Sequence, residues 1–485
     1  MPSYRSRRSD KQVADVLKFF YFVGETVTRV FNPIMSKKDN MPDDLPIITE
    51  MPWRPPETAL EVMRSKPWAA FLDSGGPPTD SRSRWTFLCL DPIETFEWKF
   101  PSLKRNGVYI NGNAWENLKN LFSKYKISPE AYKNNFSIPF LGGIVGVISY
   151  DEGMRKENIL SQHNSNTPEM VFAVYQDVYA FDRLEKRCWW ISRLGREAPH
   201  LTPRAFFEMI KIPLKAEQSR KEWTKNAEKI ISYIGNGDIF QANLTMRWRA
   251  EKPENFDELS AYYSLRDTSP APFGAYFKSP HCSLLSASVE RFVSLSSTGT
   301  IETRPNKGTT PLGQNPKEKD KNKKNLLKNE KELAENLMIT DLMRNDIGKV
   351  STLGSVTVPK LFEIEEFKHI LHLVSQINGN LKEGLTPVDL LEATIPSGSV
   401  TGAPKKRALE IIDDTEVSAR GLYCGNLFWI GHNGAMDSSV LIRSLFRIEN
   451  QISIGAGGGI TWLSDPEKEY DEMMLKAFPI LEVFR

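Results

Sequence analysis

Two pairs of glutamates are spaced so that each pair shares one face of a predicted helix. Glu332 and Glu335 lie just before or at the start of the segment 336–346, and Glu469 and Glu472 lie near the C-terminus. Residues three apart in a helix point the same way, so each pair presents two carboxylates in one direction. Two such faces meeting would form an oxygen-rich pocket suited to Mg²⁺, which takes few carboxylates and keeps waters. Ordinary solvent-exposed charges are the alternative.

Two glycine-rich segments could hold an anion. The segment 397–404 leads into a predicted helix, and the segment 455–459 follows a predicted strand. Free backbone amides at turns and helix starts bind anions, and glycines let a ligand come close to the backbone. A carboxylated or phosphorylated small molecule would suit both segments, whereas two plain tight turns would explain them equally well.

Lys307 lies on a turn punctuated by proline and glycine, just after a predicted strand, with Glu290 upstream. A lysine is a nucleophile only when neutral, which requires burial or a nearby cation. A carboxylic acid in a partly closed pocket can protonate a departing hydroxyl, and Glu290 is the candidate. The alternative is a surface lysine and a surface ion pair.

The elements that must position these residues change character near residue 200. Before it, short apolar runs such as 85–90, 141–149 and 170–175 predict a sheet-rich region. After it, the segment 221–236 has helical spacing and ends at Gly-Asn-Gly. Strands such as 274–277 and 283–285 then alternate with long helices, which predicts a mixed α/β or α+β half.

Composition and charge exclude several classes of protein. The chain has 485 residues, of which 40% are hydrophobic and 26% charged, so it can bury a large core. Its formal net charge of +2 gives no global sign of nucleic acid or of a membrane surface as partner. No Walker A loop and no Gly-x-Gly-x-x-Gly fingerprint occurs, which removes most support for nucleotide chemistry.

Four scattered cysteines fit neither a disulfide framework nor a zinc ribbon, which favours a cytoplasmic location. Residues 13–27 are the longest apolar stretch near the start, but charged residues interrupt it, so we expect no signal peptide and no transmembrane helix. The lysine-rich segment 314–331 is expected to be a solvated loop that runs into a charged helix start. A nucleic-acid patch is the less favoured alternative, because aromatic residues and arginines are missing.

These segments together resemble the chorismate-utilising enzymes, and most closely the aminodeoxychorismate synthase component I branch. The resemblance is strong over 235–476 and rests on ordered blocks, among them 237–244, 335–346, 372–375, 401–405 and 465–472. It is weaker in the N-terminal half, at 71–74, 142–143 and 150–151. We therefore expect three regions: an extension over 1–45 that is poorly ordered, a sheet-rich region over 46–200, and a chorismate-binding catalytic region over 201–485.

The resemblance implies an α+β fold in which two antiparallel sheets pack as a β-sandwich flanked by helices. It also implies that Glu335, Glu469 and Glu472 hold Mg²⁺, with Glu332 nearby. The remaining contacts to chorismate would come from the following residues: Gln241, Asn243, His372, Thr401, Tyr423, Arg443, Gly457, Gly458, Gly459 and Lys476. Cationic Arg443 and Lys476 suit a dianionic substrate.

Two positions separate the branches of the family. Members that add water carry a lysine at the place of Gln241, so glutamine favours ammonia as the incoming group and disfavours salicylate or isochorismate synthesis. Anthranilate synthases typically have alanine at the place of Lys307, whereas aminodeoxychorismate synthases have lysine. Asn306 stands where isoleucine is usual, a departure beside the lysine.

The implied reaction is the amination of chorismate to 4-amino-4-deoxychorismate through a covalent Lys307 intermediate, with Glu290 as the acid. No segment resembles a glutamine amidotransferase, so a separate glutaminase subunit is expected to supply ammonia. Because no further domain follows Arg485, pyruvate elimination is expected from a separate lyase. Asp73 and Ser74 could mark a tryptophan pocket, as in some relatives, or a plain strand-end turn.

Three rival functions remain. Anthranilate synthase component I would use the same substrate, and Lys307 argues against it. A non-catalytic chorismate or tryptophan sensor would not need the lysine and the carboxylates. A nucleic-acid adaptor would bind through residues 317–331 with strong salt dependence.

Overall fold

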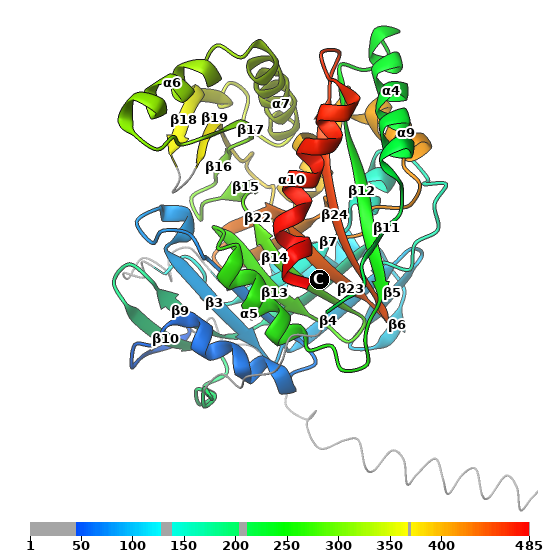
Figure 1. Cartoon of the computed structure of the whole chain (residues 1–485). Coiled ribbons are helices and arrows are strands. Elements are labelled where there is room, and N and C mark those ends of the chain that lie inside the picture. The colour runs from blue at the N-terminus through cyan, green and yellow to red at the C-terminus, as the bar shows by residue number, and fades with distance from the viewer. Residues whose placement is uncertain (1–44, 128–137, 203–210, 367–369, 485) are drawn as a thin grey trace, which may run out of the picture. The chain divides into compact units, whose positions relative to one another are not determined.

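Two antiparallel sheets form the frame of the protein, as the resemblance predicts (Figure 1). The computed structural model describes residues 45–127, 138–202, 211–366 and 370–484. The first sheet runs, in spatial order, through β1 (Ile47–Met51), β10 (Arg187–Ser192), β9 (Asp177–Asp182), β3 (Trp85–Leu90), β2 (Ala69–Asp73), β13 (Phe273–Lys278), β14 (Cys282–Ser288), β23 (Ser444–Ile448), β24 (Gln451–Ile460), β12 (Gln241–Glu251) and β11 (Lys215–Ala216), with β20 (Gly402–Ala403) paired to β12. The second runs through β17 (Asn306–Pro311), β19 (Ile370–Asn380), β16 (Thr300–Thr303), β15 (Arg291–Leu295), β22 (Met436–Val440), β21 (Asn426–Gly431), β7 (Gly143–Ile148), β8 (Met170–Tyr175), β4 (Glu94–Lys99), β5 (Ser102–Arg105) and β6 (Val108–Ile110), with β18 (Thr357–Glu366) paired to β19.

The core lies in two layers because strand side chains alternate between the faces of a sheet. On β2, Ala70 and Leu72 belong to a buried cluster that also contains Phe172 of the second sheet, so the two sheets pack face to face. Phe71, between them, belongs to a second cluster on the outer face of the first sheet. This arrangement is the predicted β-sandwich.

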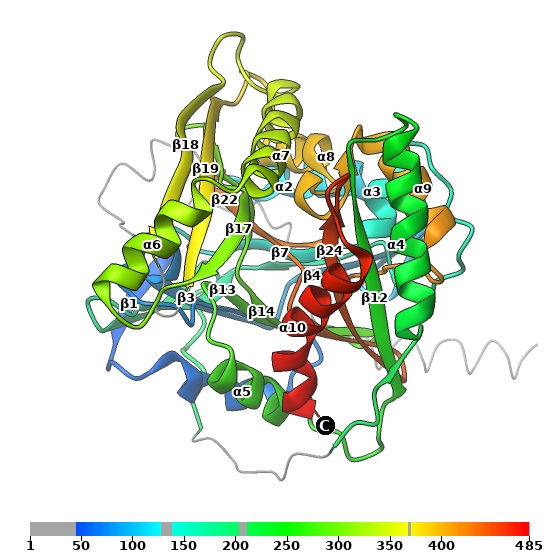
Figure 2. The same ribbon diagram turned by 45° about the horizontal axis from the view of Figure 1, so that its top comes forward.

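Helices cover the outer face of the first sheet and one end of the second. The helices are α2 (Ala114–Tyr125), α3 (Tyr150–Lys156), α4 (Arg220–Gly235), α5 (Glu258–Thr268), α6 (Pro316–Leu326), α7 (Glu330–Gly348), α8 (Pro387–Thr394), α9 (Lys405–Thr415) and α10 (Pro466–Phe484), with 3₁₀ turns at Pro56–Ser65, Ser81–Ser83 and Gly398–Val400. Figure 2 shows α4 and α10 beside β12 and β24, and α6 and α7 beside β17 and β19. The two helix groups thus flank the ends of β17 and β24.

The local predictions from sequence mostly agree with the structure. The strands expected at 85–90 and 170–175 are β3 and β8, and the helix expected at 221–236 is α4, which begins with a capping box between Ser219 and Glu222. Two expectations were wrong. The lysine-rich segment is not a loop, because Asn315 caps the helix α6 through a hydrogen bond from the Glu318 amide. The glycine run 455–459 is not a turn but part of β24, where it pairs with β12.

The predicted regions 46–200 and 201–485 divide the sequence, but their strands are neighbours in both sheets. β2 pairs with β13 in the first sheet, and β7 pairs with β21 in the second. Residues 45–485 form one compact unit. The predicted extension lies outside the described residues, apart from Leu45. Within the described part, none of the helices has the length and apolar character needed to cross a bilayer.

Candidate active site

Lys307 lies in a bulge of β17 rather than on a free turn. Asn306 pairs with Val374 and Thr309 with His372, so Lys307 and Gly308 together face a single residue of β19. Gly308 has a φ of +90°, a conformation that glycine adopts without strain. A Cβ at this position would also lie 3.0 Å from Oε2 of Glu332. Bulges re-aim neighbouring side chains, and this one brings the Lys307 backbone beside α7.

Glu290 is buried in the short connection between β14 and β15, with 8% of its surface exposed. Burial raises the pKa of this carboxyl, and the hydroxyl of Ser399 and the charge of Lys307 oppose the rise only in part. The group therefore keeps its proton to a higher pH than an exposed glutamate does. A protonated carboxyl near a lysine amine is the pair needed for an acid and a nucleophile.

The four predicted metal carboxylates lie on facing helices, as their spacing suggests. Glu335 on α7 and Glu469 on α10 are buried. Burial raises the pKa of Glu332 and of Glu335, while Lys307 and Lys331 act against it. For Glu472 burial also favours a higher pKa, but the hydrogen bond from Lys476 and the charges of Lys476, Lys331 and Lys307 together outweigh it, so the pKa is lowered. These carboxylates and lysines therefore share one electrostatic environment.

The donor chemistry of this cluster fits Mg²⁺, because carboxylate oxygens are the ligands the ion prefers. Two of the carboxylates form ion pairs with lysines: Lys331 Nζ lies 2.5 Å from Oε1 of Glu469, and Lys476 Nζ lies 2.7 Å from Oε1 of Glu472. Among the residues that the structure describes, no three His, Cys, Asp or Glu side chains are arranged as a metal-binding group. Binding of the ion would therefore require the lysines to yield these oxygens.

The glycines of β24 form a floor beside these carboxylates. Asn243 and Leu244 of β12 pair with Gly459 and Gly458. A Cβ on Gly459 would overlap Nε2 of Gln241 and lie 3.4 Å from Oε2 of Glu335. Glycine at this position is thus what allows Gln241 to lie across the strand.

A Cβ on Gly458 would be 3.9 Å from both Glu469 Oε2 and Lys476 Nζ, so α10 overlies the same strand. A Cβ on Gly457 would lie 2.6 Å from the carbonyl oxygen of Leu244. The run predicted to contact substrate therefore lies beside Gln241, Glu335, Glu469 and Lys476. The run is part of a strand and not of a turn, and it pairs with β12 on one side, while β23 pairs only with residues 451–454 of β24.

A buried histidine and a buried arginine complete the site near β19. His372 is buried, and desolvation together with the charge of Arg443 lowers its pKa to about 4, so the imidazole is neutral at physiological pH. Burial lowers the pKa of Arg443 as well, and no acidic partner of its guanidinium is found among the described residues. An arginine without an acid partner suits a substrate carboxylate.

Thr401 and Tyr423 are buried at the other wall. The Thr401 hydroxyl donates to the carbonyl oxygen of Ser397 at 2.8 Å, so it is committed to its own turn. The ring of Tyr423 packs directly on Gly455. Both residues thus shape the wall, and a contact with substrate stays a prediction.

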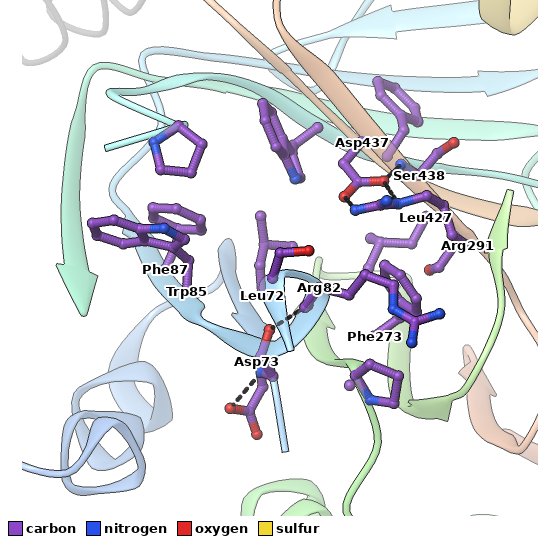
Figure 3. A pocket seen from close by; sticks show the side chains of 18 residues that line it. Leu72, Asp73, Arg82, Trp85, Phe87, Phe273, Arg291, Leu427, Asp437 and Ser438 are labelled. Atoms are coloured by element: carbon purple, nitrogen blue, oxygen red, sulfur yellow. Dashed lines mark hydrogen bonds and ion pairs between the residues drawn. The ribbon is translucent and has the colours of Figure 1, made fainter. Parts of the chain in front are cut away.

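Asp73 and Ser74 do not belong to this site. They line a separate cavity of about 180 Å³ between the sheets, walled by aromatic residues (Figure 3). Trp85 and Phe87 of β3 and Phe273 of β13 supply part of the wall, and Arg291 lies there paired with Asp437. The Asp73 carboxylate accepts hydrogen bonds from Arg266 at 2.5 Å and Tyr262 at 3.2 Å. Its charge is therefore already compensated by the protein.

Three residues near the candidate site were missed from sequence. Lys331 belongs to the segment expected to be solvated, although it directly precedes Glu332 and pairs with Glu469. Ser464 lies just before α10, and its hydroxyl donates to Glu469 at 2.7 Å. Ser399 lies inside the glycine-rich turn, and only the folded chain brings it to Glu290.

Comparison with known proteins agrees with this geometry. The sequence profile of the chorismate binding enzyme family matches residues 71–482. The chain is 34% identical to aminodeoxychorismate synthase component 1 of Escherichia coli K12 over 454 residues, covering 90% of this chain and 98% of that protein. It is 32% identical to anthranilate synthase component 1 of Thermus thermophilus over 449 residues, covering 88% and 94%.

Solved structures agree with the fold. Anthranilate synthase component I of Streptococcus pneumoniae superposes with a TM-score of 0.72 at 28% identity, covering 82% of this chain and 92% of that one. The menaquinone-specific isochorismate synthase of Escherichia coli superposes with a TM-score of 0.70 at 15% identity, covering 92% and 97%, and shares the fold. From the profile match, the identities and the shared architecture, we conclude that this chain is a member of the chorismate binding enzymes.

Proposed function

We propose that the protein aminates chorismate with ammonia to 4-amino-4-deoxychorismate, in the para-aminobenzoate branch of folate biosynthesis. The observation that carries the proposal is that Lys307, in the β17 bulge, lies close enough to the buried acid Glu290 for the lysine charge to lower the pKa of that carboxyl. Gln241 over the glycine strand, where a water-adding relative would need a basic lysine, supports ammonia as the incoming group. The sequence similarity to aminodeoxychorismate synthase component 1 proteins points the same way.

In this mechanism the neutral Lys307 amine forms a bond to C2 of chorismate. The ring double bonds shift, the C4–O bond breaks, and Glu290 gives its proton to the hydroxyl, which leaves as water. Ammonia then forms a bond to C4, the double bonds shift back, and the C2–N bond to Lys307 breaks. The lysine nitrogen keeps the bonding pair, and a proton lost from the attacking ammonia returns the site to its starting charge.

The other residues bind and orient the substrate. Arg443 and Lys476 would attract its carboxylates, the neutral His372 would line the ring, and Asn243 would guide ammonia. Glu335, Glu469 and Glu472, with Glu332 nearby, would hold Mg²⁺, which when bound neutralises carboxylate charge. A separate glutaminase subunit would supply ammonia, and a separate lyase would remove pyruvate from the product.

The test is to incubate the chain with chorismate, MgCl₂ and an ammonium salt, and to identify products by chromatography and mass with and without a purified lyase. We expect 4-amino-4-deoxychorismate from the wild type and none from Lys307→Ala, while Lys324→Ala, an exposed lysine of α6, serves as the matched control. Anthranilate as the main product would show that Lys307 does not decide the branch. Unchanged chorismate would favour a binding protein without turnover.

We propose tryptophan as the occupant of the second cavity, by resemblance to relatives that bind it there. The aromatic wall and the buried, unpartnered Ser439 hydroxyl support an aromatic ligand with a polar group. Mass spectrometry of the denatured protein and titration with tryptophan, using Ser439→Ala and Trp85→Ala, test it. Absence of tryptophan and of any binding would leave Asp73 and Ser74 as a strand-end turn.

A further inference from the structure

A fully buried ion cluster lies directly behind the walls of the candidate active site. Arg420, Glu416 and Arg247 are 5%, 4% and 2% exposed. Glu416 accepts hydrogen bonds from both arginines and from the amide and hydroxyl of Thr245 on β12. A buried ion pair is weak evidence for stability by itself, because apolar residues often replace it without loss. The contacts of Arg420 beyond this pair are therefore the informative ones.

Arg420 binds main-chain oxygens in two walls of the site at once. One terminal nitrogen donates to the carbonyl of Val400 at 2.7 Å, and the other donates to the carbonyl of Asn243 at 2.5 Å and to Glu416 at 2.7 Å. Its guanidinium also lies 4.3 Å from the centre of the Tyr150 ring. Only the planar fork of an arginine can serve these directions together; a lysine ammonium is a point donor.

The two carbonyls that Arg420 holds flank the residues that face the reaction. Val400 lies between Ser399, which hydrogen-bonds Glu290, and Thr401, whose carbonyl accepts from the Asn243 amide at 2.7 Å. Arg420 itself accepts, through its own carbonyl, from the amide of Tyr423. Arg420 thus connects three segments: its guanidinium joins the turn 397–401 to β12, and its main-chain carbonyl holds the Tyr423 loop.

We propose that Arg420, oriented by Glu416, is a positioning residue for the amination of chorismate: it fixes the turn that carries Ser399 and Thr401 against β12, and so sets the position of Glu290 and the substrate. This proposal rests on the proposed function of the site. Arg420 touches no reacting atom and acts only through the two main-chain segments. Loss of its fork would displace the wall by a fraction of an ångström to an ångström, which is enough to impair a near-attack geometry.

The chain offers a matched control. Arg447 is also buried, at 7% exposed, pairs with Glu258 at 2.6 Å, and donates to the carbonyls of Ser279 and Pro280, which lie outside the walls described for the site. The experiment compares Arg420→Lys and Glu416→Gln with Arg447→Lys in the full chain. It measures denaturation midpoint, kcat and KM for chorismate with ammonium, the pH profile of kcat, and chorismate binding by calorimetry.

We expect Arg420→Lys to lower kcat/KM for chorismate about 100-fold, with both a higher KM and a lower kcat, while Arg447→Lys stays within about twofold of wild type. The alkaline limb of the kcat profile should move to higher pH in Arg420→Lys alone, because loss of the Ser399 hydrogen bond lets Glu290 hold its proton longer. Glu416→Gln, which keeps the shape of the side chain, should have a kcat/KM between those of Arg420→Lys and Arg447→Lys.

The proposal is overturned if Arg420→Lys and Glu416→Gln keep kcat/KM within twofold of wild type, or if Arg447→Lys loses as much activity at equal stability. Should Arg420→Lys fail to fold, Glu416→Gln decides by the same criteria. If the wild type makes a product other than 4-amino-4-deoxychorismate, the proposed function is refuted. The positioning role is then tested by the ratio of chorismate affinities between the variants. A wild type that binds no chorismate refutes both.

Discussion

Replacing Gly455 with alanine tests whether the glycine strand exists to receive the Tyr423 ring. A Cβ at Gly455 would lie 2.6 Å from Cδ2 of Tyr423 and closer still to two other ring carbons. Carbon atoms are most stable about 3.5 to 4.0 Å apart, so the overlap is about 1 Å. Tyr423 is only 5% exposed, so neighbouring atoms limit how far its ring can shift. Overpacking of this kind costs about 1 to 3 kcal/mol.

The assay is chemical denaturation of the wild type, Gly455→Ala, Tyr423→Ala and the double variant. We expect Gly455→Ala to lower the free energy of unfolding by about 1 to 3 kcal/mol when Tyr423 is present. In the Tyr423→Ala background, the same substitution should lower it by less than about 0.5 kcal/mol. Gly348→Ala is the reference, because nothing lies within 4 Å of its added Cβ at the end of α7, and it should be neutral or stabilising by up to about 1 kcal/mol. An equal loss with and without the tyrosine ring would refute the packing argument.

Three further predictions concern charge. Burial raises the pKa of Glu290 above the ordinary 4.5, so its ionisation opposes folding. Glu290→Gln should therefore become more stable relative to wild type as the pH rises from 4.5. Urea melts at several pH values check this, and a difference in stability that does not change with pH would contradict it. The pKa of His372 is lowered from 6.5 to about 4, so the free energy of unfolding of the wild type should fall by up to about 3 kcal/mol as the pH falls through that window. His372→Gln should not show this loss in the same melts. Removal of divalent cations with EDTA should stop chorismate consumption and added Mg²⁺ should restore it, as followed by chorismate absorbance; full activity in EDTA would exclude a metal role for the four glutamates.

Local elements were predictable because their signals lie within a few residues. Short apolar runs identify β3 and β8, and helical spacing that ends at Gly-Asn-Gly identifies α4, without any tertiary information. The same short range explains the failure at 455–459. Consecutive glycines favour a turn by themselves, whereas here β12 supplies a ladder of hydrogen bonds that holds them in a strand.

The candidate site was predictable in its members but not in its contacts. Spacing alone put Glu332 with Glu335 and Glu469 with Glu472 on single helix faces, and the resemblance supplied Lys307 and Glu290. That Lys331 pairs with Glu469, 138 residues away, depends on how the fold places the start of α7 near α10. An ion pair between distant residues has no signature in either local segment.

The sequence by itself determined which side chains are available and which of them share a helix or a strand face, because those relations follow from the 3.6-residue and two-residue periods of the backbone. Only the tertiary structure decided that Lys307 lies in a bulge, that Glu290 is buried and has a raised pKa, and that Arg420 reaches both Val400 and Asn243. The physical reason is that desolvation and hydrogen-bond geometry depend on every segment packed around a group, and these segments meet only when the two sheets close on each other.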